Sequence, residues 1–209
     1  MIPVKVLAVR YLANASPSLC QSLNVPKGFP SLAMLTTDCD DATYIALDAA
    51  TKAAEVEVAY THSFYAGAAN ASTPHAGEVI GILAARTPGA ARSGMEAALS
   101  ALQRIGFDEV GGVPFLAHTV SSVGSFLAGE AGIPIGSALA YLIAPPLESM
   151  YAMDAALKAA DVRLCKLYSP PSETNFGGGL LTGTQSACDA ACAAFAAAVT
   201  EVASTPIIR

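Results

Sequence analysis

The chain contains one segment twice, about a hundred residues apart, and this repeat limits the folds that it can adopt. Residues 48–56 and 154–162 are identical at seven of nine positions and share the pattern Asp-Ala-Ala-x-Lys-Ala-Ala. A second pattern, Val/Ile-Pro-x-Gly, ends at Gly28 and again at Gly136, 108 residues later. Two motifs repeated in the same order indicate a tandem duplication, so we expect two copies of one domain.

Each copy has the hydrophobic periodicity and the helix start signals of a small domain of strands and helices. In the first copy we predict a strand at Leu32–Thr37, a helix from about Asp41 to Ala54, and a strand at Glu55–Tyr60. Thr87-Pro88 supplies the N-cap and first residue of a last helix. The predicted fold class is α/β (α+β type), with two tandem domains, residues 1–109 and 110–209, each a small, mostly antiparallel sheet flanked by helices.

The composition is apolar without a segment typical of a membrane span. Apolar residues make up 53% of the chain, and alanine supplies much of this fraction. We find no apolar run of the roughly 18 residues that a span requires. The N-terminal sequence also lacks the pattern of a secretory signal. We therefore attribute the excess of small apolar residues to buried interfaces and predict no membrane partner.

Charge and cysteine content exclude further classes of protein. Eleven basic and 17 acidic residues give a net charge of −6, and no Lys/Arg cluster is present, so nucleic acid is not an expected partner. Five scattered cysteines are an odd number, typical of reduced thiols in a cytosol. Cys188 and Cys192 would share one helix face, where we expect buried small residues rather than a metal pair.

The acidic segment between the predicted strand and helix is the sharpest candidate site. Asp38, Asp40 and Asp41 lie within four residues of one another. One of them could serve as a helix cap, and the others require solvent, a cation or an interface. Glu78 would join the cluster if the preceding loop folds back. Such carboxylates could hold a small ammonium ion or perform acid–base chemistry, and binding is the better supported of the two.

No catalytic, metal-binding or cofactor-binding motif accompanies these carboxylates. His62, His75 and His118 have no spacing that pairs them with cysteine or carboxylate ligands. The sequence contains no Cys-x-x-Cys, His-Glu-x-x-His or phosphate-binding Gly-Lys-Ser/Thr pattern. We therefore predict no catalytic residue, no metal and no cofactor.

Several blocks resemble one known family, the EutL shell proteins of ethanolamine-utilisation microcompartments. The resemblance covers nearly the whole chain, and the order of the blocks is specific. The blocks are residues 38–44, 48–56, 65–68, 76–79, 140–148, 170–176 and 181–188. The chain is thus similar to a structural shell protein in the cytoplasm, in the shell of a bacterial microcompartment, and not to an enzyme.

The resemblance implies an assembly and two kinds of pore. It implies two circularly permuted microcompartment domains per chain, a homotrimer that forms a flat pseudohexamer, and contacts with other shell proteins. Asp40 and Glu78 match the acidic residues of small pores that pass a permeant such as ethanolamine, and Asp41 is adjacent to them. Phe107 matches an aromatic neighbour of that pore. The matches to the loops of a gated central pore are Tyr65, Gly67, Asn70, Glu173, Thr174, Asn175, Phe176 and Gly177.

Two alternatives remain open at this point. The chain could be a soluble two-domain module that binds a small amine, with the long loops as a lid; this alternative predicts a monomer. It could also be a small lyase or hydrolase that uses Asp40 and Glu78 as an acid–base pair, although no nucleophile or metal motif supports it.

Overall fold

A computed structural model of the chain describes residues 1–64, 78–170, 172 and 174–207. The chain forms two compact units, which we name the N-terminal and the C-terminal unit. The N-terminal unit comprises Pro3–Ile105 and Gly124–Leu127, and the C-terminal unit comprises Met1–Ile2, Gly106–Val123 and Ala128–Arg209. The domain limit that the sequence predicts, between residues 109 and 110, stays a prediction, because units defined by contacts need not coincide with duplicated domains.

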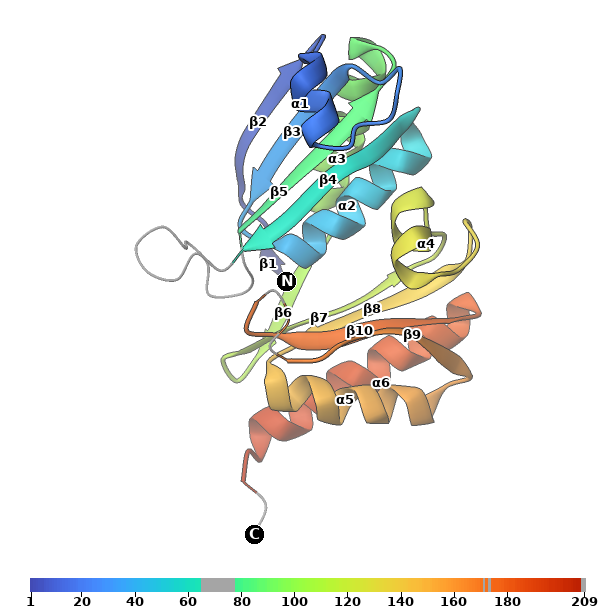
Figure 1. Cartoon of the computed structure of the whole chain (residues 1–209). Helices are drawn as coiled ribbons and strands as arrows, with labels where there is room; N and C mark the ends of the chain where they lie inside the picture. The colour runs from blue at the N-terminus through green and yellow to red at the C-terminus, as the bar shows by residue number, and fades with distance from the viewer. Residues whose placement is uncertain (65–77, 171, 173, 208–209) are drawn as a thin grey trace. The chain divides into compact units, whose positions relative to one another are not determined.

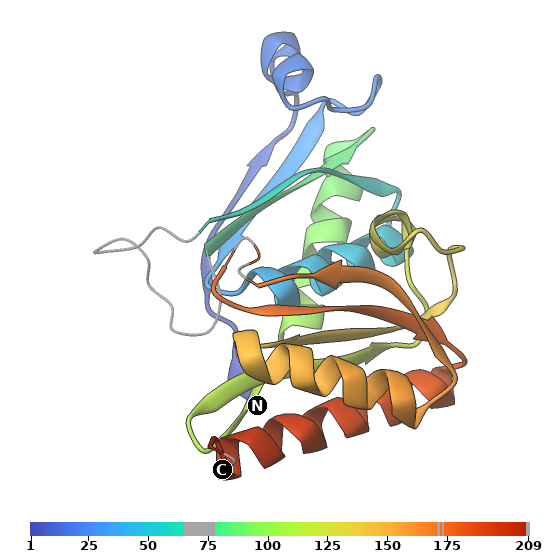
Figure 2. The ribbon, with the colours of Figure 1, turned by 60° about the horizontal axis from the view of Figure 1, so that its bottom comes forward.

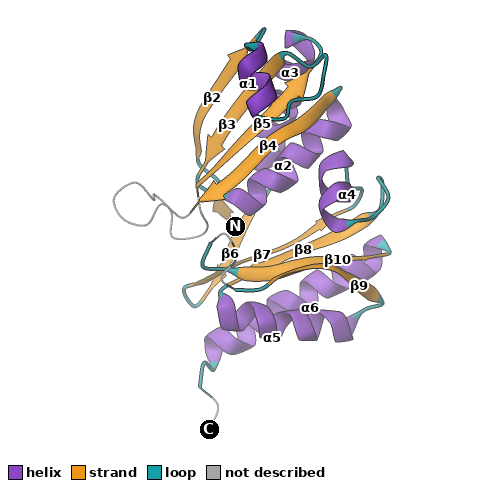
Figure 3. Cartoon of the chain, in the orientation of Figure 1, coloured by secondary structure: helices purple, strands orange, loops and turns teal. Residues whose placement is uncertain are grey.

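The N-terminal unit is built on an antiparallel sheet whose four described strands have the order β2-β3-β5-β4 (Figure 1). Its strands are β2 (Val6–Leu12), β3 (Ser31–Thr37), β4 (Val56–Phe64) and β5 (Glu78–Ala85). Its helices are α1 (Pro17–Ser22), α2 (Asp40–Ala53) and α3 (Pro88–Leu102). Helices α2 and α3 pack against each other and against this sheet, as the purple helices beside the upper orange strands in Figure 3 show.

Burial explains the strand order of this sheet. The two central strands, β3 and β5, consist almost entirely of buried residues, whereas the edge strand β2 is mostly exposed. Leu35 and Leu83 from these central strands and Leu47 from α2 have no exposed surface. A strand buried on both faces reads as a continuous apolar run, which is how β3 and β5 could be recognised in the sequence.

The C-terminal unit has a sheet whose described strands have the order β1-β6-β7-β8-β10-β9. Its strands are β1 (Ile2–Pro3), β6 (Gly106–Val110), β7 (Val113–Val120), β8 (Ala138–Ala144), β9 (Val162–Tyr168) and β10 (Gly177–Gly183). Its helices are α5 (Pro146–Ala159) and α6 (Gln185–Ser204), and α4 (Ser125–Ala131) has its first residues in the N-terminal unit. Figure 2 shows α5 and α6 side by side along this sheet.

Helix α6 is the one helix of the described residues that is long and apolar enough to span a membrane, by length and composition alone. No such segment was predicted from the sequence. One face of α6 is part of the core of the C-terminal unit, where Phe195 and Cys188 are fully buried with Leu142 of β8. This packing is typical of a core helix, which meets the same criterion.

The duplication predicted from the sequence is visible in the topology of the two units. The order β2-β3-β5-β4 in one unit corresponds to β7-β8-β10-β9 in the other. The repeated Pro-x-Gly turn also has the same geometry: Phe29 N donates to Pro26 O over 3.1 Å, and Ser137 N donates to Pro134 O over 3.2 Å. Gly28 and Gly136 have φ angles of 84° and 90° at the third turn position, where glycine is favoured.

Most predicted elements are confirmed, and two strands, β1 and β6, were not predicted. Helix α3 begins at Pro88 as predicted, and the N-cap Thr87 accepts a hydrogen bond from Ala90 N over 3.2 Å. Strand β4 extends to Phe64, four residues beyond its predicted end at Tyr60. Strand β6 was not predicted, because its charged residues Asp108 and Glu109 next to a Gly-Gly turn have the composition of a linker.

Gly178 provides a test of how closely the strands of the C-terminal unit pack. A Cβ atom at this position would lie within 2 Å of the backbone oxygen of Leu142, and the φ angle is 148°. We expect Gly178→Ala to lower the free energy of unfolding by about 2–4 kcal/mol, because backbone atoms of β8 would have to move.

Gly129→Ala is the matched control, because Gly129 is exposed on α4 and a Cβ there meets no atom within 4 Å. Alanine at a helix position should raise stability by up to about 1 kcal/mol. Thermal melting at one fixed protein concentration measures both changes. Equal melting temperatures for the two variants would contradict the close approach at Gly178.

Candidate functional site

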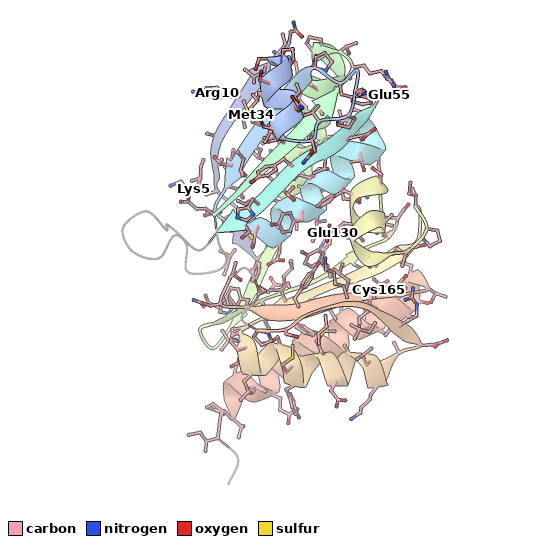
Figure 4. All side chains as sticks on the ribbon, viewed as in Figure 1. Lys5, Arg10, Met34, Glu55, Glu130 and Cys165 are labelled. Atoms are coloured by element: carbon pink, nitrogen blue, oxygen red, sulfur yellow. The ribbon has the colours of Figure 1, made fainter. Side chains whose placement is uncertain are left out.

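The predicted acidic residues lie at one end of the sheet of the N-terminal unit. Strand β3 ends at Thr37, α2 begins at Asp40, and β5 begins at Glu78. Val79 is paired with Thr37 on one side and with Ser63 on the other, so these chain segments are neighbours. Figure 4 labels Lys5 at this end of the unit and Glu55 at the opposite end.

Asp38 and Asp40 have different partners. The carboxylate of Asp38 accepts a hydrogen bond from Lys5 N over 2.7 Å, which joins the start of α2 to the chain before β2. Asp40 is only 4% exposed. Its Oδ2 accepts from the Ser63 hydroxyl over 2.5 Å, and its Oδ1 accepts from Asp41 N over 2.9 Å. Asp40 is therefore held in one orientation by two donors.

The start of α2 is stabilised differently from the capping that the sequence suggested. The N-cap residue is Cys39, whose side chain makes no capping hydrogen bond. The buried Thr37 hydroxyl instead accepts from Cys39 N over 3.2 Å and lies 2.7 Å from the Thr43 hydroxyl. Asp40 and Asp41 lie in the first turn of α2, where the helix dipole favours negative charge.

Burial changes the acid–base behaviour of this cluster. Burial raises the pKa of Asp40 above its usual range, and the hydrogen bonds from Ser63 and from Asp41 N offset part of that increase. A hydrogen bond with the Asp41 side chain also lowers the pKa of Asp40, by less than burial raises it. Burial, followed by the Asp41 charge, raises the pKa of the Cys39 thiol, so this cysteine is no thiolate nucleophile near neutral pH.

Glu78 is half-buried at the first position of β5, opposite Phe64 in the register of β4. The structure therefore brings Glu78 to the same end of the sheet as Asp40 and Asp41. That these three carboxylates line a pore stays a prediction. Among the described residues, no group of three or more His, Cys, Asp and Glu side chains could hold a metal ion.

Phe107 lies in the C-terminal unit, on β6. Its side chain is 2% exposed, and its ring centroid is 5.8 Å from that of Phe176. Phe107 is thus part of the core of this unit, and its expected place beside a small pore stays a prediction.

The residues expected in the central-pore loops are only partly described. Tyr65, Gly67, Asn70 and Glu173 lie outside the described residues. Thr174 is buried, Asn175 is exposed, and Gly177 begins β10. The Thr174 hydroxyl accepts from Phe176 N over 3.2 Å, and Ser172 N donates to Phe176 O over the same distance. These hydrogen bonds and the contact between the Phe107 and Phe176 rings fix the described residues just before β10, which belong to the second of the two predicted pore loops.

Two important residues were not predicted from the sequence. Ser63, the hydroxyl donor to Asp40, lies on the part of β4 beyond the predicted strand end. Asp48 has no exposed surface and accepts hydrogen bonds from Gly124 N over 2.7 Å and from Leu127 N over 2.9 Å. No local signal could have revealed Asp48, because the nearly identical segment around Asp154 leaves that aspartate exposed.

The cysteine pair on α6 has the buried position that the sequence predicts. Cys188 is fully buried and Cys192 is 8% exposed. Burial raises the pKa of Cys192 to about 11, so its thiol is protonated at neutral pH. Both side chains belong to the core of the C-terminal unit, together with Leu142 and Phe195.

Comparisons with known proteins define the class of this protein. Residues 31–112 match the BMC domain. The chain is 55% identical to the bacterial microcompartment shell protein EutL of Clostridium perfringens, over 99% of this chain and 97% of the relative. The crystal structure of the ethanolamine utilization protein EutL from Leptotrichia buccalis superposes with a TM-score of 0.93 at 54% identity, over 100% of this chain and 98% of that one.

A solved structure of lower sequence identity is similar to this chain in its fold alone. The trimeric bacterial microcompartment shell protein PduB superposes with a TM-score of 0.81 at 19% identity, over 94% of this chain and 88% of that one. The fold is that of tandem microcompartment-shell domains, so this is a structural shell protein rather than an enzyme. Within this class, the chain belongs to the EutL family of bacterial microcompartment shell proteins.

The raised pKa of Asp40 makes the stability of the protein depend on pH. The folded chain holds this proton to a higher pH than the unfolded chain does. The contribution of Asp40 is therefore fully present below the ordinary aspartate pKa of about 3.9 and is lost as the pH rises through the raised value. Asn can accept from Asp41 N and donate to Ser63, so Asp40→Asn should gain stability relative to the natural chain as the pH rises above the ordinary aspartate pKa of about 3.9.

Melting temperatures at several pH values measure this trend. Asp189→Asn, an identical substitution at an exposed position of α6, is the control. A difference between Asp40→Asn and the natural chain that does not change with pH would contradict the raised pKa.

Proposed function

We propose that three copies of this chain form a closed ring of six shell domains that tiles with other shell proteins. Two duplicated domains per chain support this, because three such chains supply six similar domains around one axis. The chain's family relatives are shell proteins, and the more distant PduB is described as trimeric. The observation that carries the proposal is the tandem duplication itself, seen in the equal strand orders of the two units.

We further propose that Asp40, Asp41 and Glu78 form a small acidic pore in each chain. All three lie at one end of the sheet of the N-terminal unit. Asp40 is buried and held by Ser63, so it would act on a passing cation mainly through its charge. Glu78 is half-buried, so it is the carboxylate best placed to contact a permeant directly.

The favoured permeant is a small ammonium compound such as ethanolamine. The chain's relatives belong to ethanolamine utilisation by name. Two unit charges 4 Å apart attract by roughly 4 kcal/mol at an effective dielectric near 20, before desolvation costs. The loops at residues 65–77 and 173–177 are proposed to surround a separate, gated central pore, with Phe176 as the anchor of the second loop.

The homotrimer predicts a mass of three times the 21.1 kDa chain for the purified protein. Light scattering measures this mass directly, and negative-stain images of the same sample should show hexagonal sheets at high concentration. A single-chain mass at high concentration would contradict the ring and favour a soluble two-domain binding module.

The acidic pore predicts that carboxylate removal weakens ammonium binding. We expect Asp40→Asn combined with Glu78→Gln to raise the Kd for ethanolamine at least about tenfold, which corresponds to 1.4 kcal/mol. Titration followed by NMR measures this affinity. Asp189→Asn combined with Glu96→Gln removes the same two charges at exposed positions of α6 and α3 and is the control.

Ethylene glycol is the matched neutral ligand for the same titration. It should bind weakly and equally to both double variants, because it lacks the ammonium group. Unchanged ethanolamine affinity in the Asp40/Glu78 variant would show that these carboxylates form no cation site.

A further inference from the structure

Helix α2 contains two buried aspartates whose partners differ in charge. Asp48 has no exposed surface and lies 3.3 Å from the Lys52 ammonium, so its negative charge is balanced within the chain. Asp40 is 4% exposed, and among the ion pairs of the described residues none includes it. Its described partners are a hydroxyl and a backbone N–H group, which are neutral donors. In the described part of the chain, Asp40 is therefore a buried carboxyl group without a balancing positive charge.

The register of the sheet places the hydroxyl donor to Asp40. Ser63 of β4 is 3% exposed and is paired with Val79 of β5, which is paired in turn with Thr37 of β3. Side chains of directly paired residues lie on the same face of a sheet. Thr37 and Val79 have no exposed surface, so Ser63 lies on a covered face, where its hydroxyl is 2.5 Å from Asp40 Oδ2. The strand pairing thus fixes the position of this donor.

A hydroxyl donor changes the charge state of a buried carboxyl group. A hydrogen bond donated to a carboxylate stabilises its ionised form. Burial raises the pKa of Asp40, and the hydrogen bond from Ser63 opposes this increase more than any other contact does. Without the hydroxyl, Asp40 would ionise only at a higher pH. Unlike a lysine, the hydroxyl adds no positive charge, so the carboxylate that it stabilises still attracts a cation from outside the chain.

We infer that Ser63 is a positioning residue of the acidic pore and that its hydroxyl sets the pH range in which Asp40 attracts a cation. The inference rests on the proposed acidic pore and names the residue that regulates it. Ser63 fixes the direction of the Asp40 carboxyl group and favours the loss of its proton. Alkylammonium groups stay protonated from about pH 4 to about pH 8, so the pH dependence of their binding in this range reports on the protein.

Other titratable groups lie at the same end of the sheet. His62 of β4 is exposed, and because successive residues of a strand point to opposite faces, it does not share the face of Ser63. Asp41 adds a carboxyl group next to Asp40 in the first turn of α2. The other titratable residues of the described segments that meet there are Lys5, Asp38, Cys39 and Glu78. A substitution of Ser63 leaves all of these groups in place, so its effect isolates the hydroxyl.

Ser63→Ala tests the inference, and Ser63→Thr, which keeps a hydroxyl, is the rescue variant. Thermal melting first establishes that each variant folds. NMR of chains labelled with carbon-13 in the aspartate carboxyl groups measures the pH at which Asp40 ionises, and Asp40→Asn identifies its signal. We expect Ser63→Ala to raise this pH by at least about one unit, because a hydrogen bond to a charged group is lost. Ser63→Thr should restore the natural value.

Ethanolamine titrations at several pH values measure the effect on binding. For the natural chain, the Kd should fall as the pH rises through the value at which Asp40 ionises. In Ser63→Ala the same fall should occur at least about one pH unit higher. Ser63→Cys, whose thiol is a weaker donor, should shift the fall in the same direction and repeats the test at nearly unchanged volume.

Ser31→Ala is the matched control for both measurements. Ser31 of β3 is 1% exposed, and its hydroxyl donates to Ala13 O over 2.8 Å rather than to a carboxyl group. This variant should keep the natural pH dependence of Asp40 ionisation and of ethanolamine binding.

The possible results separate this inference from the proposed pore. A natural chain that binds ethanolamine at no pH would overturn the acidic pore and this inference together. Binding with the same pH dependence in the natural chain and in Ser63→Ala would overturn the inference alone. An equal shift in Ser63→Ala and Ser63→Thr would also overturn it, because the hydroxyl would then not be the cause.

Discussion

A buried carboxylate loses its hydration, and this loss costs free energy. In the N-terminal unit, the partners of the buried Asp48 offset that cost. The side chain has no exposed surface, so its charge must be satisfied by the protein. Two backbone N–H groups, of Gly124 and Leu127, and the ammonium of Lys52 surround it. Gly124 leaves the necessary space, since a Cβ there would lie 2.2 Å from the Thr51 hydroxyl. Removal of one partner of such a buried group typically costs 3–5 kcal/mol, so this arrangement fixes where residues 124–127 lie on α2.

The duplicated sequence therefore specifies the helix but not its surroundings. Asp48 and Asp154 occupy the same position in nearly identical segments, yet one is fully buried and the other is mostly exposed. Local sequence determines that both segments are helical, with a lysine one turn after the aspartate. The contrast in burial arises from the residues that each helix meets, which lie far away in the chain.

The difference between local sequence signals and contacts with distant residues also explains which features could be predicted from the sequence. The helix start at Thr87 and the buried strand β3 follow from local signals, and the structure confirms them. The acidic residues were correctly placed between a strand and a helix. Their partner Ser63 was not foreseen, because the contact joins residues 23 positions apart across two elements. The raised pKa of Asp40 could not be predicted either, since it depends on burial, which no spacing of residues specifies.

The raised pKa of Asp40 also changes how the acidic cluster would interact with a cation. The sequence shows Asp40 and Asp41 as two carboxyl groups, but burial favours the protonated form of Asp40. An ammonium ion nearby favours the ionised form of a carboxyl group and lowers its pKa. Cation binding beside Asp40 would therefore promote the loss of its proton at a pH near the raised pKa. Such coupling makes the attraction of this carboxyl group for a cation increase with pH.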